Sequence, residues 1–310
     1  MPHTESTRQH SRLLFQRDGF ALGQFRWDAS RAGMRRDSCI GSFALIAIPW
    51  TAVRINCQGR RPVIADSCTG IFYNPNQSYV AEQLLEGVPE RTIYIVPDEQ
   101  TLRDCVTEID GRPSDDPARM LRFESGPIDA KTFIELRQLV EWLDRDTVAA
   151  NDDSLAIHEI AMRIAARLIA RSYRARGEGV SARKLQSVNE RAVSRHREIA
   201  QRVREVCLTH FHERLSLQEI AEAVDASRFH VCRLFRLMTG RSIHQYLTDL
   251  RLRASLDGVC DRCAPLARVA LDSGFSNQSH FTTAFARRFG RTPAAFRREV
   301  ARGNVYPLTI

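Results

Sequence analysis

Two stretches near the C-terminal end each carry a set of outward-facing side chains, most of which can hydrogen-bond a ligand. The first set follows the spacing i, i+3, i+4 and i+7 and consists of Phe229, Cys232, Arg233 and Arg236. The second set is more polar and consists of Gln278, Ser279, His280, Thr283 and Arg287. Guanidinium, amide, hydroxyl and imidazole groups pair with the edges of nucleic-acid bases. Helices with such a face are candidates for insertion into the major groove of DNA.

Each set lies opposite a buried stripe on a short helix with clear start and stop signals. Ser216 and Glu219 form a predicted capping box for a support helix, which ends near Asp225. Ser227 is placed to cap the next helix, which carries the first set, and Gly240 to end it. These signals predict a helix-turn-helix.

The arrangement occurs twice. The buried positions are echoed 50 residues later in the pairs Phe235 and Phe285, Gly240 and Gly290, and Tyr246 and Phe296. In the second half, residues 272–275 form the turn, and Ser276 or Asn277 caps the second reading helix. A helix over residues 243–259 is expected to join the halves and to fix the distance between the two readers. The repeat predicts a tandem helix-turn-helix that addresses two successive major-groove turns, with every residue from 199 to about 300 helical or in a short turn.

Positive charge is concentrated in the same part of the chain. Residues 196–310 contain 18 arginines and 11 acidic residues, whereas residues 1–195 contain 27 basic and 26 acidic ones. Almost all of the net charge of +8 therefore lies beside the repeat. This asymmetry favours a polyanionic partner for that end, although a solvated basic surface would show the same counts.

The first half of the chain has a different pattern. Residues 1–20 have the composition of a loose arm, and from Leu22 to about Thr107 short apolar runs alternate with turn residues, which predicts a small β-barrel or sandwich. Two amphipathic helices follow after Pro127. We therefore divide the chain into a β-rich domain (1–127), a helical packing or dimerisation segment (128–175), a linker (176–198), an all-α domain (199–302) and a tail (303–310). The fold class is α+β.

Residues 199–300 resemble the DNA-binding domain of the AraC/XylS family of bacterial transcription regulators. The resemblance rests on a combination of spaced residues: Leu217, Ile220 and Ala221; Ser227, Val231, Arg233 and Phe235; Gly240; Arg251; Ala267, Ala270, Gly274 and Phe275; Ser279, Phe281 and Phe285; and Gly290, Thr292, Pro293, Phe296 and Arg297. It departs from the family at Asp225, where a glycine is usual, and at Cys232 and Thr283, where longer polar residues are common. A left-handed conformation at Asp225 is tolerable.

The resemblance implies a set of roles for these residues. Base contacts are expected from Phe229, Cys232, Arg233, Gln278, Ser279, His280 and Thr283, and contacts to the DNA backbone from Ser227, Arg228, Arg236, Arg241 and Arg287. Arg233 is the best candidate for a bidentate guanine contact. The implied partners are double-stranded operator DNA, RNA polymerase, a small-molecule effector and a second copy of the chain.

Residues 22–107 resemble, more weakly, the cupin-like β-domain that many AraC-type regulators carry as a sensor and dimerisation module. A ligand pocket would be lined by aromatic residues, namely Trp27, Phe43, Trp50, Phe72 and Tyr73, although core packing is the commoner role for such residues. No histidine occurs between Arg12 and Ile157, so the ligand set of a metal-dependent cupin enzyme is missing and we expect no metal or other cofactor.

The main alternative is a regulator that senses thiols or metals through its eight cysteines, for example the pair Cys260 and Cys263. A cluster of Cys207, His210 and His212 does not fit one helical face. No nucleophile elbow, P-loop or HExxH motif occurs, so we expect no enzymatic activity. Neither a secretion signal nor a membrane span is visible, which makes the cytoplasm the expected location.

Overall fold

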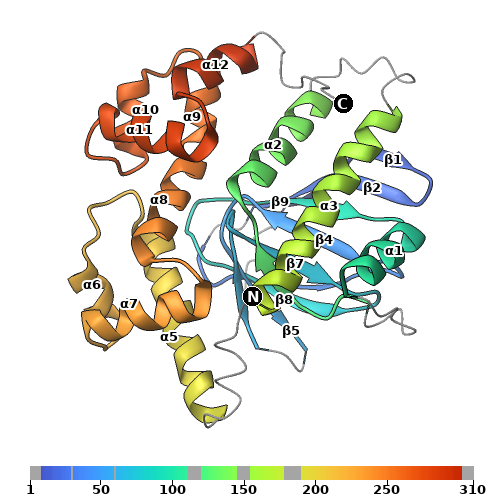
Figure 1. The fold of residues 1–310 in the computed structure, drawn as a ribbon, viewed down its shortest axis with the longest axis horizontal. Helices are drawn as coiled ribbons and strands as arrows, with labels where there is room; N and C mark the ends of the chain where they lie inside the picture. Colours follow the sequence, from blue (N-terminus) through green and yellow to red (C-terminus); the bar gives the residue numbers. More distant parts are fainter. Residues whose placement is uncertain are drawn as a thin grey trace, which may run out of the picture. The chain divides into compact units, whose positions relative to one another are not determined.

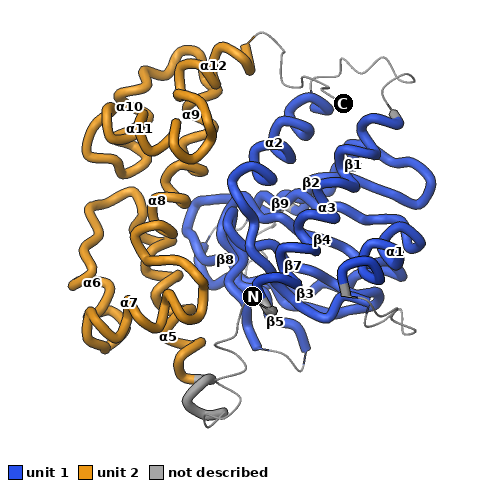
Figure 2. The backbone as a smooth tube through the Cα atoms, in the orientation of Figure 1, with its two compact units in different colours: residues 1–177 blue, residues 178–310 orange. Residues whose placement is uncertain are grey.

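The computed structural model describes residues 8–28, 31–58, 61–110, 120–144, 154–177 and 190–301. The chain divides into two compact units, residues 1–177 and residues 178–310 (Figure 2). The first contains the strands, and the described residues of the second, 190–301, form helices joined by turns (Figure 1). The predicted α+β class is therefore confirmed.

Unit 1 is built on two antiparallel sheets. The larger sheet has the order β1–β2–β9–β4–β7–β10 and the smaller one β3–β8–β5–β6. Their strands are β1 (Arg8–Arg17), β2 (Phe20–Asp28), β3 (Arg35–Cys39), β4 (Leu45–Pro49), β5 (Val53–Cys57), β6 (Val63–Ala65), β7 (Thr69–Tyr73), β8 (Ser78–Gln83), β9 (Glu90–Val96) and β10 (Ser125–Pro127). One buried cluster takes Ala47 and Ile71 from the larger sheet and Val53 and Ala81 from the smaller, so the two sheets pack face to face.

Three helices complete unit 1: α1 (Glu99–Asp110), α2 (Ala130–Asp144) and α3 (Ser154–Gly177). Figure 1 shows α2 and α3 crossing over one face of the larger sheet. Close approach requires Gly126 in β10, because a Cβ atom there would lie 1.7 Å from Ser172 Oγ of α3. The predicted helical segment 128–175 thus packs on the β-domain through its inner face.

Two expectations for this unit were wrong. The predicted arm contains β1, which pairs with β2 as an edge strand of the larger sheet. The predicted strand region extends into α1, which buries Leu102 and Val106 one helical turn apart. In both cases the polar composition hid a regular element, because only one face of an edge strand or surface helix is apolar.

The aromatic residues proposed for a ligand pocket do not form one lining. Phe72 packs edge-on against Phe123 at 4.6 Å between ring centroids, whereas its neighbour Tyr73 contacts Tyr79 at 4.7 Å. Consecutive residues of a strand point to opposite faces, so Phe72 and Tyr73 cannot line the same cavity. Trp27 is buried in the core, and Phe43 is 44% exposed. The guanidinium groups of Arg91 and Arg137 both lie over the ring of Trp50.

A charged pair is buried in unit 1. Arg36 of β3 donates to Glu90 of β9 at 3.1 Å, and both side chains are under 7% exposed. The guanidinium also lies over the rings of Phe25 and Trp27, 4.4 and 5.3 Å from their centroids. Burial lowers the pKa of Arg36, whereas the neighbouring Tyr79 and Glu90 raise it. The net effect is a raised pKa. This pair connects the two sheets.

Unit 2 contains the helices α5 (Glu190–His210), α6 (Leu217–Ala223), α7 (Arg228–Thr239), α8 (Ile243–Ala254), α9 (Leu256–Cys260), α10 (Leu266–Asp272), α11 (Gln278–Phe289) and α12 (Pro293–Ala301). Helix α5 begins at Glu190, so the last part of the predicted linker 176–198 is helical. Residues 176–177 of that linker end α3, and residues 178–189, like the predicted tail 303–310, lie outside the described residues. The expected single joining helix 243–259 ends as α8 at Ala254 and resumes as α9, with Ser255 Oγ donating to Leu252 O at the junction.

Candidate nucleic-acid interface

The pairs α6–α7 and α10–α11 form two helix-turn-helix motifs with closely similar turns. In the first turn, Asp225 is left-handed at φ 53° and the N–H of Ala226 donates to Ala221 O at 3.0 Å. In the second, Gly274 is left-handed at φ 82° and the N–H of Phe275 donates to Ala270 O at 3.0 Å. This bond satisfies a carbonyl at the end of the support helix and reverses the chain. The left-handed conformation that the family resemblance implied for Asp225 is present.

The two turns have different spatial requirements. A Cβ atom on Gly274 would lie 2.3 Å from Phe211 O and 2.9 Å from Arg251 Nε. Asp225 is exposed, so a side chain fits there. This explains why an aspartate can occupy the first turn, whereas the second turn requires glycine both for its φ angle and for its contacts.

The reading helices α7 and α11 begin and end in the same way. The side chains of Ser227 and Asn277 accept from the N–H groups of His230 and His280, at 3.3 and 2.8 Å. Each helix ends at a left-handed glycine, Gly240 at φ 74° or Gly290 at φ 75°. The predicted capping box of α6 is also formed, with Ser216 Oγ accepting from the N–H of Glu219 and the Glu219 carboxylate from the N–H of Ser216. These backbone hydrogen bonds lower the pKa of Glu219.

One face of each reading helix is buried and the other is open. Val231, Leu234 and Phe235 of α7 and Phe281, Ala284 and Phe285 of α11 are all at most 3% exposed. The residues proposed for base contact lie on the opposite face. Phe229 is 78% exposed, Cys232 is half-buried, and the others are exposed: Arg233, Gln278, Ser279, His280 and Thr283. The exposure is compatible with their proposed roles, which remain predictions.

Four of the five residues proposed for backbone contact, Ser227, Arg228, Arg236 and Arg287, are also exposed. Arg241 differs, because its Nη1 donates to Asp249 Oδ2 at 3.3 Å and its side chain is 22% exposed. The structure therefore places Arg241 in an internal ion pair. This partner was not apparent from the sequence, because Asp249 occurs eight residues later, on α8.

Asp249 connects the two halves of unit 2. It lies on α8 with its side chain 9% exposed, and the same carboxylate oxygen accepts from Arg241, which follows α7, and from Arg288 of α11. One buried carboxylate thus neutralises an arginine from each motif. We call Asp249, Arg241 and Arg288 the Asp249 clamp.

Two further arginines donate to backbone carbonyl groups near the ends of helices. Arg251 Nε and Nη2 donate to Phe211 O and Glu213 O, both at 2.7 Å, beyond the end of α5. Desolvation lowers the pKa of Arg251. Arg297 donates to Val259 O at 2.9 Å and to Ala264 O at 2.7 Å, around the end of α9. These contacts give structural roles to two residues that carry the family resemblance.

The cysteines are dispersed over both units. Cys57, Cys68 and Cys207 are buried, and Cys39 and Cys263 are exposed. Burial raises the pKa of Cys105, the opposite of what an activated thiolate requires. Among the residues that the structure describes, no three histidine, cysteine or acidic side chains are placed to hold a metal ion, and no helix is long and apolar enough to cross a bilayer.

The fold and the exposed faces of α7 and α11 define a tandem helix-turn-helix domain, and sequence comparison agrees. A family model described as a helix-turn-helix domain matches residues 220–299. The right origin-binding protein of Escherichia coli (strain K12) is 35% identical over 89 residues, which are 29% of this chain and 31% of that protein. The bifunctional transcriptional activator/DNA repair enzyme AdaA of Bacillus subtilis is 29% identical over 87 residues, 28% of this chain and 41% of that protein.

Solved structures give matches of two kinds. The DNA-binding domain of AdpA, in complex with a target DNA, is 28% identical and covers 33% of this chain and 94% of its own, with a TM-score of 0.31. ToxT from Vibrio cholerae is 11% identical and covers 91% of this chain and 98% of its own, with a TM-score of 0.33. This chain spans about a third of the length of the first curated relatives that it matches. The C-terminal unit carries a helix-turn-helix domain of the AraC type.

Proposed function

We propose that this chain is a sequence-specific transcription regulator of the AraC type, in which α7 and α11 enter two successive major grooves on one face of operator DNA. The observation that carries the proposal is the pair of exposed reading faces on one frame that the Asp249 clamp holds together. A rigid frame sets the distance between the two readers, and basic residues around them neutralise phosphates. The two halves bury equivalent residues but expose unlike ones, so each protomer is expected to recognise an asymmetric site.

Within this proposal, Arg233 is the main base-reading residue of α7. Its side chain is exposed and it lies one helical turn from Phe229 on the same face. A bidentate contact from an arginine to guanine discriminates against other bases by about 1–3 kcal/mol. On α11 the polar residues Gln278, Ser279, His280 and Thr283 would read the second groove.

Unit 1 is proposed to receive the signal, as a small-molecule effector or a protein partner. Its helices α2 and α3 would also supply the surface for a homodimer, and RNA polymerase would be a further partner of the DNA-bound form. This part of the proposal rests on the resemblance to AraC-type regulators. It includes a cytoplasmic location and the absence of an enzymatic activity.

The alternative proposal is an AraC-type sensor that responds to oxidants or metals through its cysteines. Cys260 is the last residue of α9, and Cys263 follows three residues later. The N–H of Cys263 donates to Asp261 Oδ1 at 2.9 Å. A thiol switch would therefore act beside the second motif. If the double variant Cys260→Ser with Cys263→Ser regulates as the wild type does under oxidant and metal challenge, this alternative is excluded for that pair.

The main proposal is tested by selecting sites for the full-length protein from a library of random duplexes. We expect one enriched motif with two unlike parts, separated by about one helical turn of DNA, ~10 base pairs. The variant Arg233→Ala should bind the selected site about 10-fold more weakly, equivalent to about 1.4 kcal/mol, with non-specific binding nearly unchanged. Absence of any enriched motif would contradict the proposal, and an equal loss on selected and unrelated DNA would contradict the reading role of Arg233.

A further inference from the structure

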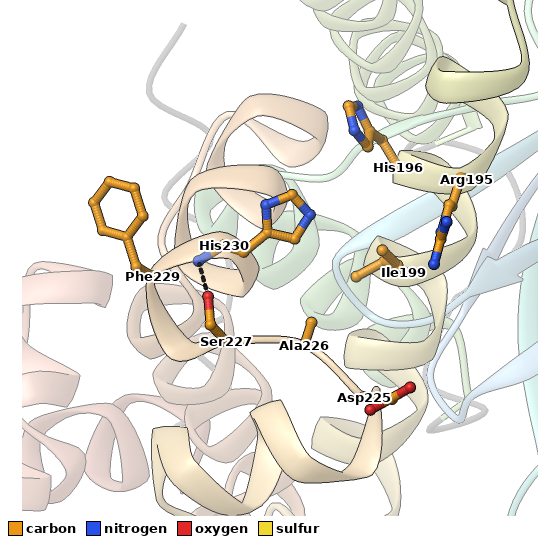
Figure 3. Close-up of a pocket in the computed structure, with 8 residues that line it drawn as sticks. All are labelled: Arg195, His196, Ile199, Asp225, Ala226, Ser227, Phe229 and His230. Carbon is orange, nitrogen blue, oxygen red and sulfur yellow. Dashed lines mark hydrogen bonds between the residues drawn. The ribbon is translucent and has the colours of Figure 1, made fainter.

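A pocket lies between the beginning of α5 and the beginning of α7 (Figure 3). We call it the α5–α7 pocket. Its volume is about 480 Å³, and it is lined by Arg195, His196, Ile199, Asp225, Ala226, Ser227, Phe229 and His230. The pocket exists because α5 starts at Glu190, which brings Arg195 and His196 beside the first helix-turn-helix.

Several side chains that can donate hydrogen bonds line the α5–α7 pocket. Arg195 is exposed and has no ion-pair partner among the described residues. The Nδ1 atom of His196 is buried and has no hydrogen-bond partner in the described structure. The rings of His196 and His230 lie 6.1 Å apart between centroids, and Figure 3 shows both imidazoles on the same side of the pocket. Ser227 Oγ already accepts the N–H of His230, which leaves its hydroxyl proton for a ligand.

This arrangement fits an oxyanion better than a cation. A guanidinium group donates in a planar fork, and each imidazole and the hydroxyl add a further donor. The acidic residue at the pocket, Asp225, has its carboxylate directed away from the two imidazole rings in Figure 3. A metal ion would have to bind beside Arg195 with only two imidazoles, and three convergent ligands are not found among the described residues.

The position of the pocket indicates which oxyanion it receives. Ser227 and Phe229 border both the pocket and the reading face of α7, and Phe229 is 78% exposed toward that face. When the N-terminal residues of a reading helix contact base edges, the first helix of the motif, here α6, crosses the sugar-phosphate backbone. The turn residues 225–227 between α6 and α7 line the pocket, so the pocket borders the same part of the motif. A phosphodiester is therefore the anion that would reach Arg195 and the two histidines.

We propose that the α5–α7 pocket holds one backbone phosphate of the DNA, bound by Arg195, His196 and His230. The proposal rests on the DNA-binding function proposed above and adds α5 to the interface. A phosphate contact fixes the position and register of the protein and carries no sequence information of its own. Loss of this contact should therefore weaken binding to all duplexes alike, unlike the loss of Arg233.

The test compares Arg195→Gln and His230→Gln with Arg197→Gln in the full-length protein. Arg195 and His230 are exposed, so folding is expected to be retained. Arg197 is the matched control, because it is exposed, outside the pocket lining, and two residues further along α5, roughly 200° around the helix. The affinity for a labelled duplex of about three helical turns, ~30 base pairs, is measured between 50 and 200 mM salt.

We expect Arg195→Gln to reduce the slope of log affinity against log salt by about 1. Its fold-loss of affinity over this salt range should then be roughly 4-fold smaller than that of the wild type. Binding to selected and unrelated duplexes should fall by the same factor. His230→Gln should weaken both duplexes by a common factor, and Arg197→Gln should retain the wild-type slope. A scan with single methylphosphonate substitutions should find one position that weakens the wild type but not Arg195→Gln.

Three results would overturn the proposal in different ways. If the wild type binds DNA and both pocket variants keep its affinity and slope, the phosphate contact is wrong and the DNA-binding function stands. If the wild type binds no duplex, both proposals fail. A free ligand is tested without DNA, by comparing the Tm in inorganic phosphate with the Tm in chloride at equal ionic strength. If phosphate raises the Tm of the wild type but not that of Arg195→Gln, and if the variant binds DNA as the wild type does, the pocket would be assigned to a free phosphate compound instead.

Discussion

The Asp249 clamp makes the sharpest quantitative prediction about unit 2. Substitution Asp249→Asn retains the size of the side chain and removes the charge that neutralises Arg241 and Arg288. Hydrogen bonds to charged groups contribute about 1.5–3 kcal/mol, and breaking a fully buried pair costs about 3–5 kcal/mol. The two arginine side chains are 22% and 37% exposed, so water can hydrate them after the change. We therefore expect the free energy of unfolding of unit 2 to fall by about 2 kcal/mol, at the lower end of these values.

Calorimetry of the full-length protein measures this effect as a shift of the transition of unit 2. For a domain of this size, 2 kcal/mol corresponds to a decrease in Tm of roughly 8 °C. The control is Asp272→Asn, which removes the exposed i,i+4 pair with Arg268, whose side chains are 56% and 72% exposed. Exposed pairs contribute under about 1 kcal/mol, so the control should shift Tm by less than half as much.

The clamp also predicts an effect on DNA binding that stability alone does not produce. A rigid frame presents both readers at the correct spacing, so a site with two intact halves should bind more tightly than a site with one half scrambled. In Asp249→Asn this advantage should shrink, because the readers have to be ordered during binding. If Asp249→Asn leaves both the Tm and the ratio of the affinities for the intact and the half-scrambled site unchanged, Asp249 does not hold the two motifs together.

Two further predictions concern turns and caps. In urea unfolding, Gly274→Ala should destabilise unit 2 by about 3 kcal/mol, because the left-handed φ and the contact with Phe211 O both oppose a side chain. Gly240 is also left-handed but has open space around it, so Gly240→Ala should cost only about 1 kcal/mol. Equal losses in the two variants would contradict the close approach at Gly274. Because folding lowers the pKa of Glu219 from its ordinary 4.5, the capping box stabilises α6 fully above that value and loses its contribution as the pH falls through the lowered pKa. Replacement Glu219→Gln should therefore reduce the loss of Tm between neutral and acidic pH, and an identical acid profile for both proteins would show that the capping box does not contribute to it.

Local features of unit 2 were predictable from the sequence because they depend on residues a few positions apart. The capping box of Ser216 and Glu219 and the glycine at the end of α7 follow from side-chain chemistry within four residues. The left-handed turn at Asp225 was implied by the family resemblance. The buried and exposed faces of the reading helices follow from the 3.6-residue period in the same way.

Long-range partners were not predictable by this reasoning. The spacing of residues showed Arg241 as one more basic residue near the reading helix, and only the fold reveals that Asp249 and Arg288 share its charge. The same holds for the α5–α7 pocket, where residues from two helices and a turn meet. In unit 1, composition suggested an aromatic pocket, but strand alternation separates Phe72 from Tyr73.

The contact between Gly274 and the end of α5 has a consequence for how this domain can be altered. Phe211 O accepts from Arg251 Nε and also lies where a side chain at residue 274 would be, so the turn of the second motif is packed on the first half of the domain. His212 Nδ1 and Asp272 O, 2.8 Å apart, add a second link across the same boundary. The two motifs are therefore not interchangeable modules, and a hybrid regulator that receives a foreign second motif would also need the donor's residues at 211–213 and 251.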